Sequence, residues 1–472
     1  MAEQLLVDFR GRLVIIGFGS IGQGLLPLLL RHLGMSHEAI TVVSADDQGR
    51  AVAARYGVRY RVSALEPGNY RQVLDPLVAR GDFIVNVSVD VASVALIAYA
   101  REKGALYLDT CIEPWPGGYD DPSLPLARRT NYALREEALA LRDGRAESPT
   151  AVLTHGANPG LVSHFVKRAL LDVAADLGLA VGRPQSRDDW AGLACALGVR
   201  VIHIAERDTQ LSSVRKMPNE FVNTWSVDGF VSEARQPCEL GWGTHERHFP
   251  ADGHRHEHGS QAAIYLAQPG CATRVRSWTP RHGAFHGLAI THSEAISIAD
   301  YLTLGRPESP DYRPTVHYAY HPCDDALLSV HEFCGRNYVA QETKRILMDE
   351  ISPGGVDELG VLLAGHSRNA YWYGSQLSVD EARPLAPHNS ATSLQVTSAA
   401  LAGIVWAIEN PARGIVEPEN LDFERILEIC LPYLGPVVGV YSDWTPLAGR
   451  GRLFPEGIDH SDPWQFRNVR VS

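Results

Sequence analysis

The feature that most constrains this chain is a glycine-rich turn near its N-terminus, in "RLVIIGFGSIGQG". Gly17, Gly19 and Gly22 form G-x-G-x-x-G directly after an apolar strand and at the head of a predicted helix. Such glycines let the backbone approach a pyrophosphate, which the N-terminus of the helix stabilises. The motif predicts a Rossmann-type fold that binds a dinucleotide, with Ser20 and Ile21 as further contacts.

An acidic residue follows the second apolar run, "AITVVSADD". Asp46 lies 24 residues after Gly22, where this fold places a carboxylate that accepts hydrogen bonds from the adenosine ribose. A carboxylate there repels the 2′-phosphate of NADP, so the pattern predicts NAD. Arg50 lies nearby and leaves the preference open.

Three more strand-like runs follow, "DFIVNVSVD", "ALYLDTCIEP" and "AVLTHGANPG". Their alternation with amphipathic segments is typical of βαβ units, so we expect an α/β domain with a doubly wound parallel sheet over residues 1–160. After residue 160 the sequence pattern changes to short strand-like runs between long polar loops. This change predicts a second, α+β substrate domain over residues 161–388. A helix in the C-terminal segment, residues 389–472, should return to pack on the first domain.

Ligands of open parallel sheets lie outside the carboxyl ends of the strands. The ends of the three later strands carry Asp90, Glu113 and Asn158, which we therefore expect around the nicotinamide. Thr110 precedes Glu113 at the same strand end and is expected beside the cofactor. Each polar residue could instead be a helix cap or a solvated loop side chain.

The stretch "FVNTWSVDGFVSEA", residues 221–234, has an Asp-Gly pair between two β-like runs, which predicts a hairpin. A two-residue loop would turn Trp225 and Glu233 to opposite faces, whereas a bulged loop or an irregular tip would bring them together. We expect the second arrangement, because an indole face and a carboxylate together suit a bound cation. Packing alone would also explain a tryptophan in a strand.

Composition excludes several classes of protein. A formal charge of −12 disfavours nucleic acid as a partner, because phosphate binding needs a basic face. The apolar run of residues 399–408 is too short to span a bilayer, and the N-terminus lacks the features of a signal peptide. Seven scattered cysteines without a C-x-x-C pair suit reduced thiols in the cytoplasm. Five histidines in residues 245–258 could suggest a metal, but a polar loop explains them more simply, and we expect no metal site.

Several segments together resemble the bacterial homospermidine synthases, relatives of the saccharopine dehydrogenase-like enzymes. They are "GFGSIGQG", "VNVSVD", "HGANPG", "NTWSVDGFVSEA", "ELGWGTHE" and "ITHSEA", and the likeness extends over essentially the whole chain. The resemblance implies a cytoplasmic homodimer that holds NAD as a prosthetic group. It implies a reaction that joins two putrescines with loss of ammonia, or spermidine and putrescine with loss of 1,3-diaminopropane.

The resemblance also implies roles for individual residues. Trp225, Glu233, Asn158 and His292 would be catalytic, and the substrate amines would be held by Asp90, Glu113, Glu206, Glu233 and Asp357. The residue types suit the chemistry, because carboxylates hold ammonium groups and an aromatic face stabilises a transient cation without attacking it.

The sequence is also compatible with two other functions. A saccharopine or carboxynorspermidine type of dehydrogenase would bind an amino-acid carboxylate, for which arginine is the suitable partner. A non-catalytic NAD(H) sensor would need the glycine motif but neither Trp225 nor Glu233.

Overall fold

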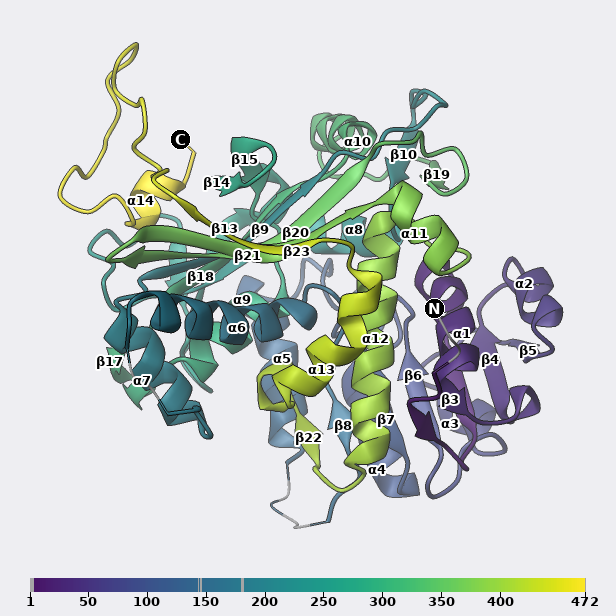
Figure 1. Cartoon of the computed structure of the whole chain (residues 1–472). Coiled ribbons are helices and arrows are strands. Elements are labelled where there is room, and N and C mark those ends of the chain that lie inside the picture. The colour runs from purple at the N-terminus through teal and green to yellow at the C-terminus, as the bar shows by residue number, and fades with distance from the viewer. Residues whose placement is uncertain (1–3, 143, 145–146, 180–181, 472) are drawn as a thin grey trace.

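Two β-sheets with one long helix between them organise the chain (Figure 1). The computed structural model describes residues 4–142, 144, 147–179 and 182–471, so the outermost residues of the expected domains lie outside the described residues. The N-terminal part of the chain forms a parallel sheet, and the part after residue 200 forms a larger mixed sheet. The fold is therefore α/β, as the glycine motif and the strand pattern predict.

The first sheet has seven parallel strands in the order β22-β8-β7-β6-β2-β4-β5. Its interior strand β2 is buried on both faces, as in parallel sheets covered by helices on both sides. The strands are β2 (Leu13–Ile16), β4 (Ile40–Ser44), β5 (Arg59–Val62), β6 (Phe83–Asn86), β7 (Leu106–Asp109), β8 (Ala151–Val152) and β22 (Ile415–Val416). The five strands expected from the sequence are β2, β4, β6, β7 and β8.

Helices cover both faces of this sheet, which makes it doubly wound. One apolar cluster joins β2 to α1 and α12, and a second joins the opposite face to α3, α4 and α5. The helices that follow strands of this sheet are α1 (Ser20–His32), α2 (Arg50–Arg55), α3 (Tyr70–Leu74), α4 (Ser93–Lys103) and α5 (Asn131–Ala140). Short pieces complete this part, namely β1 (Val7–Asp8), β3 (Leu33–Gly34), η1 (His37–Ala39) and η2 (Leu126–Arg128).

The second sheet is mixed, with the main order β12-β13-β11-β18-β9-β20-β21-β23, and the β14–β15 hairpin joins it through β18. Strands β9 and β18 at its centre run parallel, and β20 pairs antiparallel with β9. The strands are β9 (Val201–Asp208), β11 (Pro237–Gly241), β12 (Gly253–Arg255), β13 (Ala263–Pro269), β14 (Arg274–Thr279), β15 (Gly283–Leu288), β18 (Thr315–His321), β20 (Val356–His366), β21 (Asn369–Ser378) and β23 (Val437–Ser442).

The remaining elements surround the second sheet. Two small two-stranded sheets pair β10 (Glu220–Asn223) with β19 (Thr343–Ile346) and β16 (Leu304–Arg306) with β17 (Ser309–Tyr312). The helices are α6 (Leu161–Asp176), α7 (Arg187–Leu197), α8 (Val227–Arg235), α9 (Ser293–Tyr301), α10 (Asp324–Gly335), α11 (Val379–Leu385), α13 (Phe423–Cys430) and α14 (Phe466–Val469). The 3-10 turns are η3 (Gly270–Ala272), η4 (Pro418–Asn420) and η5 (Leu431–Tyr433).

Helix α12 (Ala391–Glu409) connects the two sheets. It packs on α1 and β7 of the first sheet and on β20 and β21 of the second, and in Figure 1 it runs through the middle of the molecule. Ser390 caps its first turn, and Asn389 Nδ2 donates to Gly24 O at 3.0 Å, which fixes its start against α1. Among the described residues it is the one helix long and apolar enough to cross a membrane, but 89% of that window is buried in the protein, as expected for a core helix.

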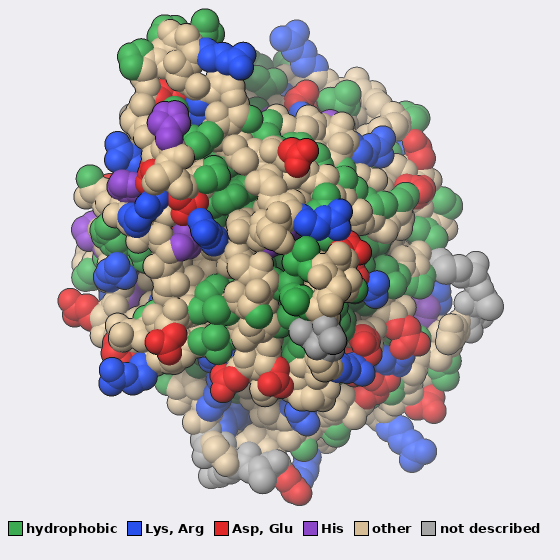
Figure 2. Space-filling model, turned by 60° about the vertical axis from the view of Figure 1, so that its left-hand side comes forward, with side chains coloured by type: hydrophobic (Ala, Val, Ile, Leu, Met, Phe, Trp, Pro, Cys, Tyr) green, Lys and Arg blue, Asp and Glu red, His purple; other side chains and the backbone are tan. Residues whose placement is uncertain are grey.

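The surface carries charges of both signs. Figure 2 shows one face of the molecule, on which acidic and basic side chains are interspersed and do not gather into large regions of one sign. A loop of the C-terminal segment projects from the body (Figure 1), and Leu453 and Phe454, between β23 and α14, are exposed.

Candidate active site

The glycine turn between β2 and α1 lies against the next strand connection. Gly17 has φ +84°, and a Cβ there would lie 2.7 Å from the Ser88 backbone. A Cβ on Gly22 would lie 2.8 Å from Gly17 O, whereas Gly19 has open space in front of it. The Ser20 hydroxyl in the first turn of α1 is buried without a hydrogen-bond partner. The turn therefore offers close backbone approach and an unpaired donor at a helix N-terminus, which fits a dinucleotide pyrophosphate.

Asp46 lines the same cavity just after β4. Its carboxylate accepts a hydrogen bond only from the Gln48 amide among the described residues, at 2.9 Å, so it remains accessible to a ribose. The Arg50 guanidinium lies over the Tyr60 ring at 5.3 Å, and no arginine among the described residues lines the cavity. This arrangement favours NAD over NADP, as the sequence predicts.

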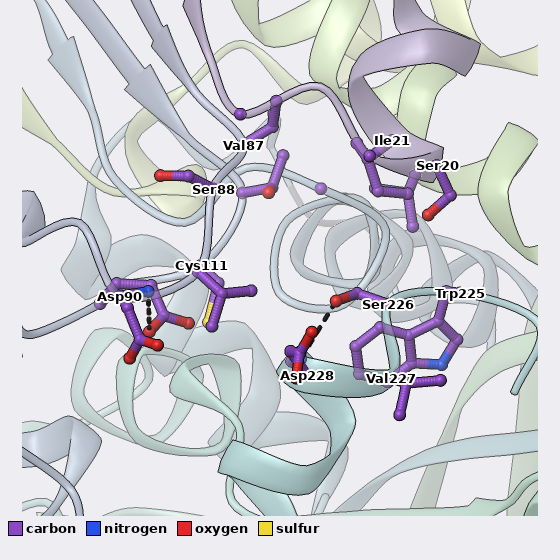
Figure 3. A pocket seen from close by; sticks show the side chains of 18 of the residues that line it. Ser20, Ile21, Val87, Ser88, Asp90, Cys111, Trp225, Ser226, Val227 and Asp228 are labelled. Atoms are coloured by element: carbon purple, nitrogen blue, oxygen red, sulfur yellow. Dashed lines mark hydrogen bonds between the residues drawn. The ribbon is translucent and has the colours of Figure 1, made fainter. Parts of the chain in front are cut away.

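The carboxyl ends of the parallel strands meet the second sheet at this cavity, which measures about 800 Å³. Asp90, Glu113 and Asn158 line it, as expected from their positions after the strands, and Thr110 lies beside them. In Figure 3, Asp90 and Trp225 lie on opposite sides of the view, with Cys111 and Asp228 between them. The second sheet and its loops contribute Glu206, Trp225, Glu233, His292 and Tyr318 to the wall.

The expected hairpin at residues 221–234 is wrong. Asp228 and Gly229 lie in the first turn of α8, where the Ser226 hydroxyl accepts a hydrogen bond from the Gly229 amide at 3.1 Å. The apolar side chains of this segment recur at helical spacing and are buried, whereas a strand would have exposed half of them. Trp225 immediately precedes the helix and Glu233 lies within it, and both line the cavity.

Glu233 is part of a buried chain of charged groups. Its Oε2 lies 3.0 Å from His292 Nε2, and His292 Nδ1 lies 3.2 Å from Glu294 Oε1. Burial lowers the pKa of His292, but the two carboxylates outweigh it and raise that pKa to about 10. The imidazole is therefore an imidazolium at neutral pH, donates from both nitrogens and fixes the Glu233 carboxylate in place.

Glu206 is the second buried carboxylate, and it extends from β9 into the cavity. Its Oε2 accepts hydrogen bonds from Tyr318 at 2.5 Å and Asn158 at 2.8 Å. Burial raises its pKa to about 7, although both hydrogen bonds oppose the shift. Its Oε1 has no hydrogen-bond partner among the described residues. The carboxylate is thus able to take or release a proton near neutral pH.

Aromatic contacts hold Trp225 at the cavity wall. Its Nε1 donates to Tyr320 Oη at 3.2 Å, and the Tyr320 ring stacks on Tyr318 with centroids 5.2 Å apart. The indole also packs on Phe230 of α8, with centroids 5.6 Å apart. Because its nitrogen is hydrogen-bonded within the protein, the indole presents carbon atoms to the cavity.

Asp357 takes a different place from the other expected residues. It is fully buried on β20 and does not line the cavity. Thr392 lines the wall and donates to Asp357 Oδ2 at 2.6 Å, so Asp357 lies behind it. Burial and the nearby Glu206 and Asp208 carboxylates raise the pKa of Asp357 well above its usual range.

Sequence reasoning missed several residues in and near the wall. Asp208 does not line the cavity, but it lies two positions after Glu206 on the same face of β9, and this period-2 spacing was a readable signal. Asp228 and Lys344 both line the cavity and form an ion pair with each other. Lys344 comes from β19, and we find no sequence pattern that would have brought it to the site.

The histidine-rich segment, residues 245–258, lies away from this cavity. Its side chains have separate partners: His245 Nε2 contacts Trp464 O, His248 contacts Asp459, and His256 stacks on Tyr132. Within the described ranges no group of three or more possible ligands could hold a metal ion.

Comparisons with known proteins agree with this geometry. Residues 13–152 match the family described as the saccharopine dehydrogenase NADP binding domain, and residues 156–440 match the saccharopine dehydrogenase C-terminal domain. The chain is 56% identical over 465 residues to a homospermidine synthase of Blastochloris viridis, covering 98% of this chain and 97% of the relative. It is 52% identical over 470 residues to a homospermidine synthase of Mesorhizobium japonicum, with the same coverage.

A solved structure extends the comparison to the whole fold. The homospermidine synthase of Legionella pneumophila, in complex with NAD, is 50% identical to this chain and covers 98% of each chain with a TM-score of 0.92.

Proposed function

This chain belongs to the homospermidine synthases, within the saccharopine dehydrogenase-like family, and we propose that it joins two diamines in the cavity between its sheets. One putrescine is oxidised to an iminium, which loses ammonia to water. The aldehyde condenses with the amine of a second putrescine, and the new imine is reduced. Two putrescines give one homospermidine and one ammonia with no net change in oxidation state. With spermidine as the first amine, 1,3-diaminopropane leaves in place of ammonia.

The observation that carries this proposal is the charge of the cavity. Five carboxylates line it beyond the glycine turn, namely Asp90, Glu113, Glu206, Asp228 and Glu233. Lys344 and His292 are the cationic groups among the described residues of the wall, and each already pairs with a carboxylate. Burial and the neighbouring Glu233 raise the pKa of Glu113 well above its usual range. Ammonium groups of a diamine relieve this repulsion.

Glu206 is the proposed general base. Hydride leaves an amine-bearing carbon only when the nitrogen lone pair is free, yet alkylamines have pKa values near ~10 by analogy with lysine. A carboxylate with a pKa of about 7, already fixed by Asn158 and Tyr318, is suited to take that proton. NAD, when bound at the glycine turn, accepts the hydride in the first half of the cycle and returns it in the second.

Other side chains position the amines and shield the cation. The carbon face presented by Trp225 stabilises the iminium through cation–π attraction and offers no nucleophile. Glu233, held by the His292 imidazolium, orients an ammonium group. Asp90 and Glu113 hold the distal ammonium, and Asp357 supports the wall through Thr392.

The alternatives fit less well. A dehydrogenase of an amino acid would need an arginine for the carboxylate, and none lines the cavity in the part of the chain that the structure describes. A sensor would have no use for the buried acids around the indole, and identity above 50% to homospermidine synthases extends over nearly the whole chain.

Deuterated putrescine tests the proposed cycle. The purified protein is given NAD and putrescine deuterated at both amine-bearing carbons. We expect homospermidine and ammonia in equal amounts, with all deuterium retained in the product and no free NADH. Unlabelled NADH added to the solution should not dilute the label. Release of one NADH per amine consumed would contradict an internal cycle.

We also propose that the protein acts as a cytoplasmic homodimer, as the resemblance to its family implies. The described part of the chain contains seven free cysteines, which suits a reducing compartment. Light scattering during size exclusion should give twice the chain mass of 51.7 kDa, and a single-chain mass at micromolar concentration would refute the dimer.

A further inference from the structure

A second cavity, of about 520 Å³, lies on the other face of the strands that carry the active-site residues. Glu206 on β9 is in register with Tyr320 on β18, and Arg207 is in register with His321. Successive side chains of a strand point to opposite faces, so Arg207 and His321 face away from the active site. The cavity opens between them and the β14–β15 hairpin.

The wall of this cavity is rich in cationic and imidazole groups. None of the described residues that line it is Asp or Glu. Its guanidinium and imidazole groups are those of Arg207, Arg274, His282, His286, His321 and His331. This composition contrasts with the overall charge of −12 and with the acidic cavity on the other side of the sheet.

Few carboxylates lie close enough to neutralise the positive charge of the two arginines. Arg207 donates to Asp208 O at 2.9 Å and contacts His321 Nδ1 at 2.5 Å, and its one ion-pair partner among the described residues, exposed Asp324, is 3.9 Å away. Arg274 contacts His331 Nε2 at 3.2 Å and forms no ion pair with a carboxylate in the described part of the chain. Both guanidinium groups therefore keep most of their charge for a ligand.

The histidines supply donors of another kind. Burial and the charge of Arg207 lower the pKa of His321, and burial with the nearby arginines lowers that of His286. Both imidazoles are therefore neutral near pH 7 and can donate one hydrogen bond each. His282 pairs with the buried Glu358 at 2.6 Å, which among the described residues is the one acid bound to a lining side chain at short range.

We propose that this cavity binds a small organic dianion, whose anionic groups are phosphate or carboxylate. Two guanidinium groups recognise such planar or tetrahedral oxyanions through paired hydrogen bonds. The apolar residues Phe285, Leu288 and Leu327 line the rest of the wall and suit the carbon skeleton of a metabolite. The volume lies in the range of small-molecule sites.

Calorimetric titration of the NAD-loaded enzyme tests the site, because bound NAD occupies the pyrophosphate turn on the other side of the sheet. The probes are inorganic phosphate and citrate, each at constant ionic strength. We expect saturable binding of one anion per chain. If phosphate binds more tightly, the site selects a phosphate group, and if citrate binds more tightly, it selects carboxylate groups. Arg274→Gln should weaken binding by about tenfold or more, since a charged hydrogen-bonding partner is lost.

Arg281→Gln is the matched control, because Arg281 is exposed next to the cavity but does not line it. This variant should change the affinity by less than about twofold if general electrostatics contribute little. Arg207→Gln provides a second test on the opposite wall. Absence of saturable binding at millimolar phosphate and citrate would overturn the proposal. So would equal affinity in wild type and both cavity variants, when these keep their NAD content and melting temperature.

Discussion

At the scale of single residues, the protonation of Glu206 decides the first step of the proposed reaction. Glu206→Gln keeps the shape of the side chain but cannot accept the amine proton, so the rate should fall by about a hundredfold or more. In the wild type, kcat/KM for putrescine should rise with pH through about 7, where the carboxyl group ionises. Steady-state homospermidine formation measured from pH 6 to 8 checks both expectations, and a Gln variant with unchanged rate would exclude Glu206 as the base.

Trp225 tests whether an aromatic face stabilises the cation. Cation–π attraction at a desolvated site is worth ~2 kcal/mol, so Trp225→Ala should slow turnover by roughly thirtyfold, and Trp225→Phe should retain part of the rate. Trp444→Phe is the matched control, because that half-buried tryptophan packs on Trp464 away from the cavity. Near-full activity of a folded, NAD-loaded Trp225→Ala variant would show that the indole only packs against its neighbours and does not stabilise the cation.

Asp46 tests the assignment of the cofactor. Asp46→Ala should weaken NAD binding by roughly 1.5 to 3 kcal/mol, because a hydrogen bond to a charged group is lost. The neighbouring Asp47 is also exposed but does not line the cavity, so Asp47→Ala should leave the affinity unchanged. Fluorescence titration of cofactor-free protein measures both, and equal affinities in the two variants would mean that Asp46 does not hold the ribose.

At the scale of elements, the short segment before and within α8 was the hardest to predict. The Asp-Gly pair and the Val and Phe residues favour a hairpin locally, but burial of one apolar face and the Ser226 cap stabilise a helix instead. The same apolar spacing was present in the sequence, but local β propensity conceals it in so short a segment. Trp225 and Glu233 nevertheless both line the cavity, although the element that carries Glu233 is a helix and not the predicted hairpin.

Gly229 links the helix to the indole. A Cβ on Gly229 would lie 3.1 Å from Trp225 Cζ3, so Gly229→Ala should move the ring by a few tenths of an ångström. Alanine favours the helix by roughly 0.5 to 1 kcal/mol, so the variant should melt no lower than wild type while turnover falls by about threefold or more. Gly192→Ala in α7 has open space and should leave turnover unchanged. Unaltered turnover in Gly229→Ala would show that the ring tolerates displacement.

At the scale of the whole molecule, the sequence predicted the parallel sheet and its ligand edge because glycine turns and buried strands leave local patterns. The meeting of distant segments leaves none. Asp357 joins the site through Thr392, 35 residues later, and Lys344 arrives on a strand of a separate small sheet. Strand β22 returns to the edge of the first sheet after α12. Such contacts depend on the topology of the complete chain.

Buried acids give the whole molecule an unusual dependence of stability on pH. Burial raises four carboxyl pKa values to about 7, those of Glu206, Glu239, Glu246 and Glu419. The folded protein therefore binds these protons more tightly than the unfolded chain. The stability they contribute is fully present below the unfolded pKa of about 4.5 and is lost as pH rises through 7. His292, with a pKa of about 10, likewise stabilises fully below about 6.5 and less above it.

Other groups limit this effect at lower pH. Burial lowers the pKa of three histidines, His155, His256 and His317, to about 4, so the stability they contribute is lost as pH falls below about 6.5. Cys334, whose pKa is lowered to about 7 by its contact with Cys271, opposes the four acids and His292 as pH falls from 9 to 7. The melting temperature of the NAD-saturated enzyme should therefore rise as pH is lowered from 8 to 6.5 and level off or decline below that. Calorimetric scans in buffers of equal ionic strength measure it. Glu206→Gln should flatten the slope of melting temperature against pH, because one proton-binding site is gone. A melting temperature that falls as the pH is lowered from 8 to 6.5 would mean that these acids are ionised in the folded protein.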